Sequence, residues 1–229
     1  MEENQLLNCL CGPVVIYQSI SERSMPDVCK LLMGKITFHI RNRSIIKRNH
    51  KYFGKDFSWG AKKVNRILKR LEEENILKII DDHTLEIFNY HRYTSNFIYV
   101  DDCMEDAMRS CFDDLNEDFS IYENTPWPIN LPRSIVVSKL SSAEKLLMGM
   151  FFLQIIEDKE KKTRGRKKPK NQLHISKQKI RRYLNWDLKK ISNVITMLEE
   201  KKIIKSRGTN KYKMLNYNDI LKGDINGKP

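Results

Sequence analysis

Side chains that can hydrogen-bond to nucleic acid bases and phosphates are concentrated in one short stretch of the sequence. An asparagine amide can make two hydrogen bonds to the edge of adenine, and an arginine guanidinium can make two to guanine. Lysine ammonium groups neutralise phosphates. The stretch supplies all three kinds of group. Its candidate contact residues are Ser58, Lys62, Lys63, Asn65, Arg66, Lys69 and Arg70.

Those side chains can act together only if a regular element points them the same way, and the residues between them predict a helix. Val64, Ile67, Leu68 and Leu71 recur at helical spacing and form one apolar stripe. The basic residues fall on the other side of this helix, which faces solvent. Ser58 stands where an N-cap would.

A β-hairpin is predicted directly after this helix. Residues 76–88 form two short alternating apolar runs around a turn at Asp81-Asp82-His83. A basic helix followed at once by a hairpin resembles the recognition helix and wing of a winged helix-turn-helix domain. The resemblance implies that the helix enters the major groove of double-stranded DNA.

The same stretch occurs a second time, 127 residues later. Residues 57–90 match residues 184–217 with 10 identities over 34 positions and without a gap. Upstream, residues 30–34 repeat as residues 145–149 at an offset of 115. We infer a two-copy domain duplication, because the period far exceeds the ~20–50 residues of stacked repeats. The difference between 127 and 115 gives the second copy 12 extra residues.

The second copy carries its own candidate contact residues. They are Lys177, Lys189, Lys190, Ser192, Asn193, Thr196, Arg207 and Lys211. The predicted wings differ in charge, because phosphates would repel the acidic tip of the first wing, whereas Arg207 suits a narrow, electronegative minor groove. We therefore expect only the second wing to touch DNA. Trp59 and Trp186, at the two helix starts, are expected to pack under the turn.

Local patterns predict the remaining elements of the first copy. Val14–Tyr17 reads as a strand or as an apolar staple against the first core. The first helix is predicted to begin near Ser24 and to run toward Ile40. Ser44 is predicted to cap a short second helix, and Gly54 to make the turn into the recognition helix.

The second copy gives clearer signals. Ser141–Glu144 is a capping-box pattern that starts its first helix. Leu173–Ile175 reads as the first strand of the wing sheet, and Ser176 as the cap of a second helix. Asn185 is predicted to cap the recognition helix, and residues 203–217 to form the wing.

The extra residues of the second copy form a basic insert, residues 159–171. Within it, the sequence Thr-Arg-Gly-Arg-Lys-Lys-Pro-Lys at residues 163–170 resembles an AT-hook. The resemblance implies that Arg164 and Arg166 lie in AT-rich minor groove, although Lys167 stands where the family has proline. The alternative is a charged loop that only adds counterion release.

Between the copies the sign of the charge inverts. Residues 101–119 are strongly acidic, with apolar residues at helical spacing, and predict an amphipathic helix. This helix is expected either to dimerise the chain or to cover a basic face until DNA displaces it. The domain organisation is a lead-in (1–23), a first winged-helix domain (24–97), a connector with a proline-rich end (98–139), a second winged-helix domain (140–218) and a tail (219–229).

Composition restricts the class of protein. The net charge of +13 and the pI near 9.5 point to nucleic acid or another anionic partner. No apolar run reaches the ~18–20 residues that span a bilayer, and the acidic start of the chain predicts no signal peptide. Five cysteines without a CxxC pair favour reduced thiols in the cytoplasm, at the nucleoid. No cofactor, metal site or catalytic set is predicted.

The whole chain resembles tandem winged-helix DNA-binding proteins. The fold class this implies is mainly α with small β-hairpin wings, an α+β arrangement. The leading hypothesis is a sequence-specific double-stranded DNA-binding protein that regulates transcription and is not an enzyme. The alternatives are a plasmid or phage replication initiator or partition protein on iterated sites, and a protein-interaction adaptor. RNA binding ranks last, because the aromatic residues form no stacking platform.

Overall fold

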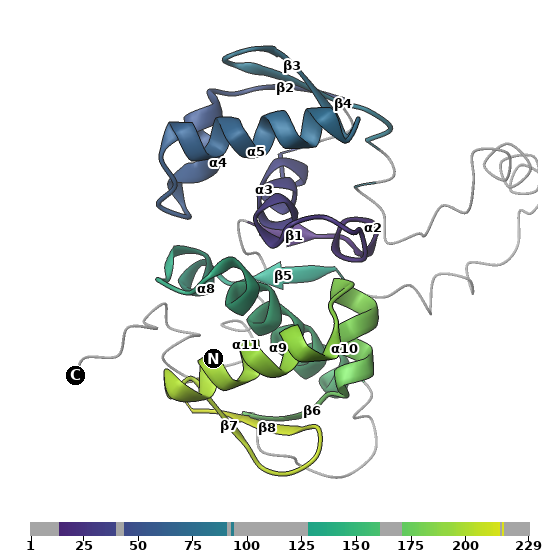
Figure 1. The fold of residues 1–229 in the computed structure, drawn as a ribbon, viewed down its shortest axis with the longest axis vertical. Coiled ribbons are helices and arrows are strands. Elements are labelled where there is room, and N and C mark those ends of the chain that lie inside the picture. The colour runs from purple at the N-terminus through teal and green to yellow at the C-terminus, as the bar shows by residue number, and fades with distance from the viewer. Residues whose placement is uncertain are drawn as a thin grey trace, which may run out of the picture.

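Two similar α+β units make up the described part of the chain, in a tandem winged-helix-like arrangement (Figure 1). The computed structural model describes residues 14–39, 44–90, 93, 128–160, 171–215 and 217. The first unit spans residues 14–87 and the second residues 129–214. This is the predicted fold class, with two copies of one module.

Each unit runs strand, short helix, long helix, strand, two helices and a hairpin. The first consists of β1 (Val14–Ile16), α2 (Gln18–Ser21), α3 (Asp27–Thr37), β2 (Ile45–Lys47), α4 (His50–Lys55), α5 (Ala61–Glu73), β3 (Leu77–Asp81) and β4 (Thr84–Ile87). The second consists of β5 (Ile129–Leu131), α8 (Arg133–Val137), α9 (Ser142–Glu160), β6 (Gln172–His174), α10 (Lys177–Leu184), α11 (Leu188–Glu200), β7 (Ile204–Ser206) and β8 (Lys211–Met214). The wing sheets are antiparallel, in the order β2-β4-β3 and β6-β8-β7.

The duplication is confirmed element by element. β5 and α9 begin 115 residues after β1 and α3, whereas β6, α10, α11 and both wing strands begin 127 residues after their counterparts. The change of offset falls between α9 and β6, where the basic insert was predicted. The structure also extends the duplication upstream to β1 and β5, which the sequence comparison did not include.

The two units are joined by a two-stranded antiparallel sheet made of β1 and β5. Val15 pairs with Asn130, which is its own counterpart at the offset of 115. Val14 pairs with Leu131, which is the counterpart of Ile16. Ile16 in turn pairs with Ile129, which is the counterpart of Val14. This register is the signature of a local two-fold axis through the central pair.

Two glycines let α3 and α9 pack closely on this sheet. A Cβ on Gly34 would lie 2.5 Å from Ile16 Cγ1, and a Cβ on Gly149 would lie 2.4 Å from Ile129 Cγ2. Both distances are too short for a side chain. Gly34 and Gly149 are themselves 115 residues apart, so the two-fold relation extends from the strands to the helices that cover them.

The predicted apolar stripes form the cores of the units. Val64, Ile67, Leu68 and Leu71 of α5 are all buried. The matching residues of α11 are buried as well; they are Ile191, Val194, Ile195 and Leu198. Each helix therefore has one buried side and presents its other side to solvent, as its periodicity predicts.

The predicted helix after Ser44 is wrong. Residues 45–47 form strand β2, which pairs with β4 and completes a three-stranded wing sheet. The short helix α4 begins only after it, and Asn49 caps it by accepting a hydrogen bond from the Lys51 amide at 2.9 Å. Two isoleucines in a row fit the half-buried surface of a strand, and they outweigh the capping signal of a single serine.

Gly54 does not make the turn into the recognition helix, because it lies inside α4. A Cβ there would come within 2.4 Å of Val64 Cγ2 and 2.9 Å of the Trp59 carbonyl oxygen. The glycine is needed for the close crossing of α4 and α5.

The predicted caps of both recognition helices are also wrong. Ser58 and Asn185 have φ values of +55° and +49°, so they are left-handed turn residues between two helices. An N-cap requires extended backbone. Gly60 fills that position for α5 without a side-chain bond, and Asp187 fills it for α11 by accepting from the Lys190 amide at 2.6 Å.

Other local predictions are confirmed. Ser141 and Glu144 form the reciprocal capping box of α9, with bonds of 2.7 and 3.3 Å. Ser176 caps α10 through the Lys179 amide at 3.1 Å. The first helix is shorter than predicted: it begins at Asp27, after Pro26 as its N-cap, and ends at Thr37.

Some predictions fall outside the described residues. They concern the acidic helix at 101–119, the bulk of the basic insert with Arg164 and Arg166, and the tail. Among the residues that are described, no helix is long and apolar enough to cross a membrane.

Candidate nucleic-acid interface

The solvent side of α5 is a dense polar and basic face. Its exposed members are Lys62, Asn65, Arg66, Lys69 and Arg70. Among the described residues, Arg70 is the one member of this face with an ion pair, its Nε lying 3.3 Å from Glu74 Oε1 one turn later. The centre of the face therefore presents the Asn65 amide and the Arg66 guanidinium to solvent.

Lys63, in the first turn of α5, is half-buried. Its Nζ lies 4.4 Å from the centroid of the Trp59 ring, within cation–π distance. Burial lowers the pKa of Lys63, and the charge of Arg66 lowers it further. Trp59 itself stacks on Phe57, with ring centroids 4.5 Å apart, so it packs under the turn as predicted.

The solvent side of α11 is less charged and more apolar than that of α5. Lys189, Asn193 and Thr196 are exposed, whereas Ser192 is half-buried. The Ser192 hydroxyl donates to the Leu188 carbonyl at 2.9 Å and accepts from Lys177 Nζ at 2.9 Å. The contact joins Lys177 and Ser192, which were both predicted to contact DNA. It also places the start of α10 beside the exposed face of α11.

Lys190 is held at the junction of the two units. Its Nζ lies 2.7 Å from Asp27 Oδ2 of the first unit and 4.5 Å from the centroid of the Trp186 ring. Trp186 is buried, and its Nε1 donates to Asp27 Oδ1 at 2.8 Å. The side chain of Lys190 is 38% exposed, but its charge is already matched within the protein. It is therefore a weaker candidate for a phosphate contact than the sequence implied.

The wing tips have opposite electrostatic character. In the second wing, Arg207 and Lys211 are exposed on a tight turn in which Gly208 has a φ of +127°. In the first wing, the His83 amide donates to Asp81 Oδ1 at 2.7 Å. That bond, together with those from Thr84, lowers the pKa of Asp81 and so favours its charged form. The sequence predicted this difference between the tips.

Two buried lysines occupy equivalent places at the junction. Lys30 donates to the Ser21 carbonyl of its own unit at 2.5 Å and to the Leu184 carbonyl of the other unit at 2.6 Å. Lys145 donates to the Val136 carbonyl at 2.6 Å and lies 5.5 Å from the ring centroid of Phe57 in the other unit. Burial, as the largest cause, lowers the pKa of each lysine to about 8.

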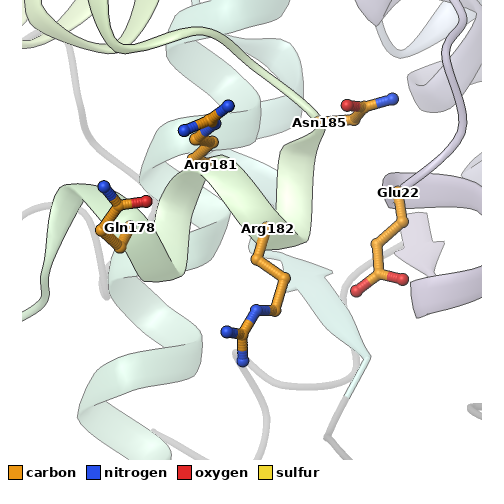
Figure 2. A pocket seen from close by; sticks show the side chains of 5 residues that line it. All are labelled: Glu22, Gln178, Arg181, Arg182 and Asn185. Carbon is orange, nitrogen blue, oxygen red and sulfur yellow. The ribbon is translucent and has the colours of Figure 1, made fainter.

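Arg181 and Arg182 of α10 are exposed cations that lie outside the predicted contact residues. They line an open hollow of about 420 Å³ at the junction, with Glu22 of the first unit on its far side (Figure 2). The helical signal was present in the sequence, because Arg181 lies four residues after Lys177 and so on the same side of the helix. Arg181 thus shares the side of α10 from which Lys177 contacts Ser192 of α11.

The two units thus present an exposed polar helix each, flanked by a wing and, in the second unit, by the cations of α10. In the described ranges, no three His, Cys, Asp or Glu side chains gather as a metal site would require. Comparison with known proteins found no family model, no curated protein and no solved structure that matches the chain.

Proposed function

We propose that this chain is a sequence-specific double-stranded DNA-binding protein that regulates transcription. The observation that carries the proposal is the solvent face of α5. Asn65 and Arg66 lie exposed at the middle of a helix whose opposite side is buried in the core. A single helix of this kind fits the major groove, where these two side chain types read adenine and guanine.

The surrounding charges support DNA over a protein partner. Lys62, Lys69 and Lys189 are exposed on the two recognition helices, and Arg207 extends from the second wing. Cations around a reading face supply the sequence-independent part of the affinity through counterion release. A protein-binding face would instead carry an apolar centre and few lysines.

The direct test is a titration of labelled genomic fragments at roughly 150 mM salt. Non-specific binding at that salt is typically only ~10⁻⁴–10⁻⁶ M. The proposal predicts a small set of fragments that bind far more tightly than bulk DNA and that include promoter regions. Equal affinity for every fragment would remove the sequence-specific claim.

A matched pair of variants ties the result to α5. Arg66→Ala removes the central guanidinium, and Lys139→Ala removes an exposed cation on the segment between α8 and α9. Each variant loses one positive charge. We expect only the first to weaken binding to the selected fragment relative to bulk DNA.

A further inference from the structure

The junction of the two units fixes their symmetry. In the β1–β5 sheet, Val15 pairs with its own counterpart Asn130, which places a two-fold axis through that pair. The buried lysines follow the same axis, because Lys30 and Lys145 each bind a carbonyl of their own unit and then reach the turn before the other unit's recognition helix. The two units therefore form a pseudo-dimer within one chain.

A two-fold rotation has consequences for the reading helices. It leaves height along its axis unchanged, so the exposed faces of α5 and α11 lie at the same level along that axis. It also reverses direction across the axis, so the two helices meet a shared duplex with opposite polarity. Two recognition helices related by a two-fold axis match two DNA half-sites in inverted orientation. Half-sites in direct orientation require helices related by translation.

The first turns of α5 and α11 lie near the junction of the two units. Lys190, in the first turn of α11, binds Asp27 across the junction. Lys63, in the first turn of α5, is close enough to Lys145 of the other unit that its charge lowers the pKa of Lys145. The wings lie at the opposite ends of the long axis (Figure 1). The first turns of both helices therefore face the middle of the pseudo-dimer, and the wings face its flanks.

The backbones of the two units are related by symmetry, but the side chains on the solvent sides of α5 and α11 differ. Asn65, Arg66 and Lys69 of α5 correspond to Ser192, Asn193 and Thr196 of α11. All but Ser192 are exposed, and Ser192 is half-buried. The two halves of a bound site would then differ in sequence while keeping opposite orientation.

We infer that one chain, without dimerising, reads an imperfect inverted repeat in double-stranded DNA. One half-site belongs to α5 and carries a guanine opposite Arg66. The other belongs to α11 and carries an adenine opposite Asn193. Arg207 adds a minor-groove contact at the outer flank of the second half-site alone. The inference deepens the proposed function and rests on it.

The experiment starts with selection of bound duplexes from a random pool by the full chain. Footprinting and sedimentation then give the protected bases and the number of chains per duplex. From the selected sequence, three duplexes are made: the original, one with the second half-site reversed into direct orientation, and one with that half-site scrambled.

We expect one chain per duplex and two protected half-sites in inverted orientation. We also expect the reversed and scrambled duplexes to bind at least about tenfold more weakly than the original. The Arg66→Ala variant should lose base preference in one half-site only, and Asn193→Ala in the other, with Lys139→Ala as the control that changes neither.

The possible results distinguish a failure of the inverted-repeat inference from a failure of the proposed DNA-binding function. Equal binding of the original and reversed duplexes, protection of one half-site only, or two chains per pair of half-sites would overturn the inference while leaving specific DNA binding intact. Selection that enriches no sequence would remove the proposed function as well.

Discussion

Lys30 and Lys145 are buried lysines at the junction of the two units. The two residues are 1% and 4% exposed, and each ammonium group donates to a main-chain carbonyl of its own unit. Their folded pKa values of about 8 lie below the ordinary value of 10.5. Between those values the unfolded chain binds more protons than the folded chain, so the free energy of unfolding should rise as the pH increases from 8 to 10.5.

Urea unfolding at several pH values tests this expectation. A Lys30→Met, Lys145→Met double variant should show a flatter rise with pH than the wild type, because it has lost both titrating groups. The overall charge of the protein affects both proteins in nearly the same way. Parallel pH profiles would contradict the assigned pKa values.

Neighbouring lysines at the start of α11 should differ in their contribution to DNA binding. Lys189 is exposed, whereas Lys190 is paired with Asp27 at 2.7 Å. Lys189→Ala should reduce the slope of log binding constant against log salt by about 1, the value for one lost phosphate contact. Lys190→Ala should leave that slope nearly unchanged. The two slopes are measured by fluorescence anisotropy, and the reverse order would show that Asp27 releases Lys190 to DNA.

At the scale of elements, two variants test which residue caps α11: Asp187, the N-cap, or Asn185, the left-handed turn residue. Asp187→Ala should lower the free energy of unfolding by about 0.5–2 kcal/mol, because it removes the bond to the Lys190 amide. Asn185→Gly should be neutral or slightly stabilising, because glycine adopts the left-handed conformation without strain. Chemical denaturation compares the two variants, and a larger loss for Asn185→Gly would restore Asn185 as the cap.

The crossing of α4 and α5 gives a second test on elements. Gly54→Ala places a Cβ against Val64 and the Trp59 carbonyl, and should destabilise the protein by roughly 1–3 kcal/mol through overpacking. Gly60→Ala is the matched control, because nothing lies within 4 Å of its added Cβ. Similar denaturation midpoints for both variants would argue against this close packing.

The elements also show what sequence patterns can predict. The recognition helices were found because a thirteen-residue amphipathic helix repeats its signal over several turns. Strand β2 was missed because three residues carry little periodicity. The caps were misplaced because serine and asparagine favour both N-caps and left-handed turns, and only the backbone distinguishes the two. Of the candidate site residues, the exposed ones on α5 were placed well, whereas the pairing of Lys190 with Asp27 depends on contacts between distant residues.

At the scale of the molecule, the junction was beyond sequence reasoning. Strands β1 and β5 have three residues each and pair across more than a hundred residues of chain. The repeated lysines at positions 30 and 145 showed that the copies are related, but not that they face each other. The two-fold arrangement relates α5 and α11, whose exposed side chains differ, across the β1–β5 pair.

The central claim is that the solvent face of α5 reads DNA. Its most direct test is the affinity of Arg66→Glu for the selected duplex and for bulk DNA, compared with Lys139→Glu, which changes the net charge equally. The account predicts that Arg66→Glu loses about a hundredfold or more on the selected duplex, equivalent to ~2.7 kcal/mol or more, while Lys139→Glu loses far less. Equal losses for the two variants would contradict it.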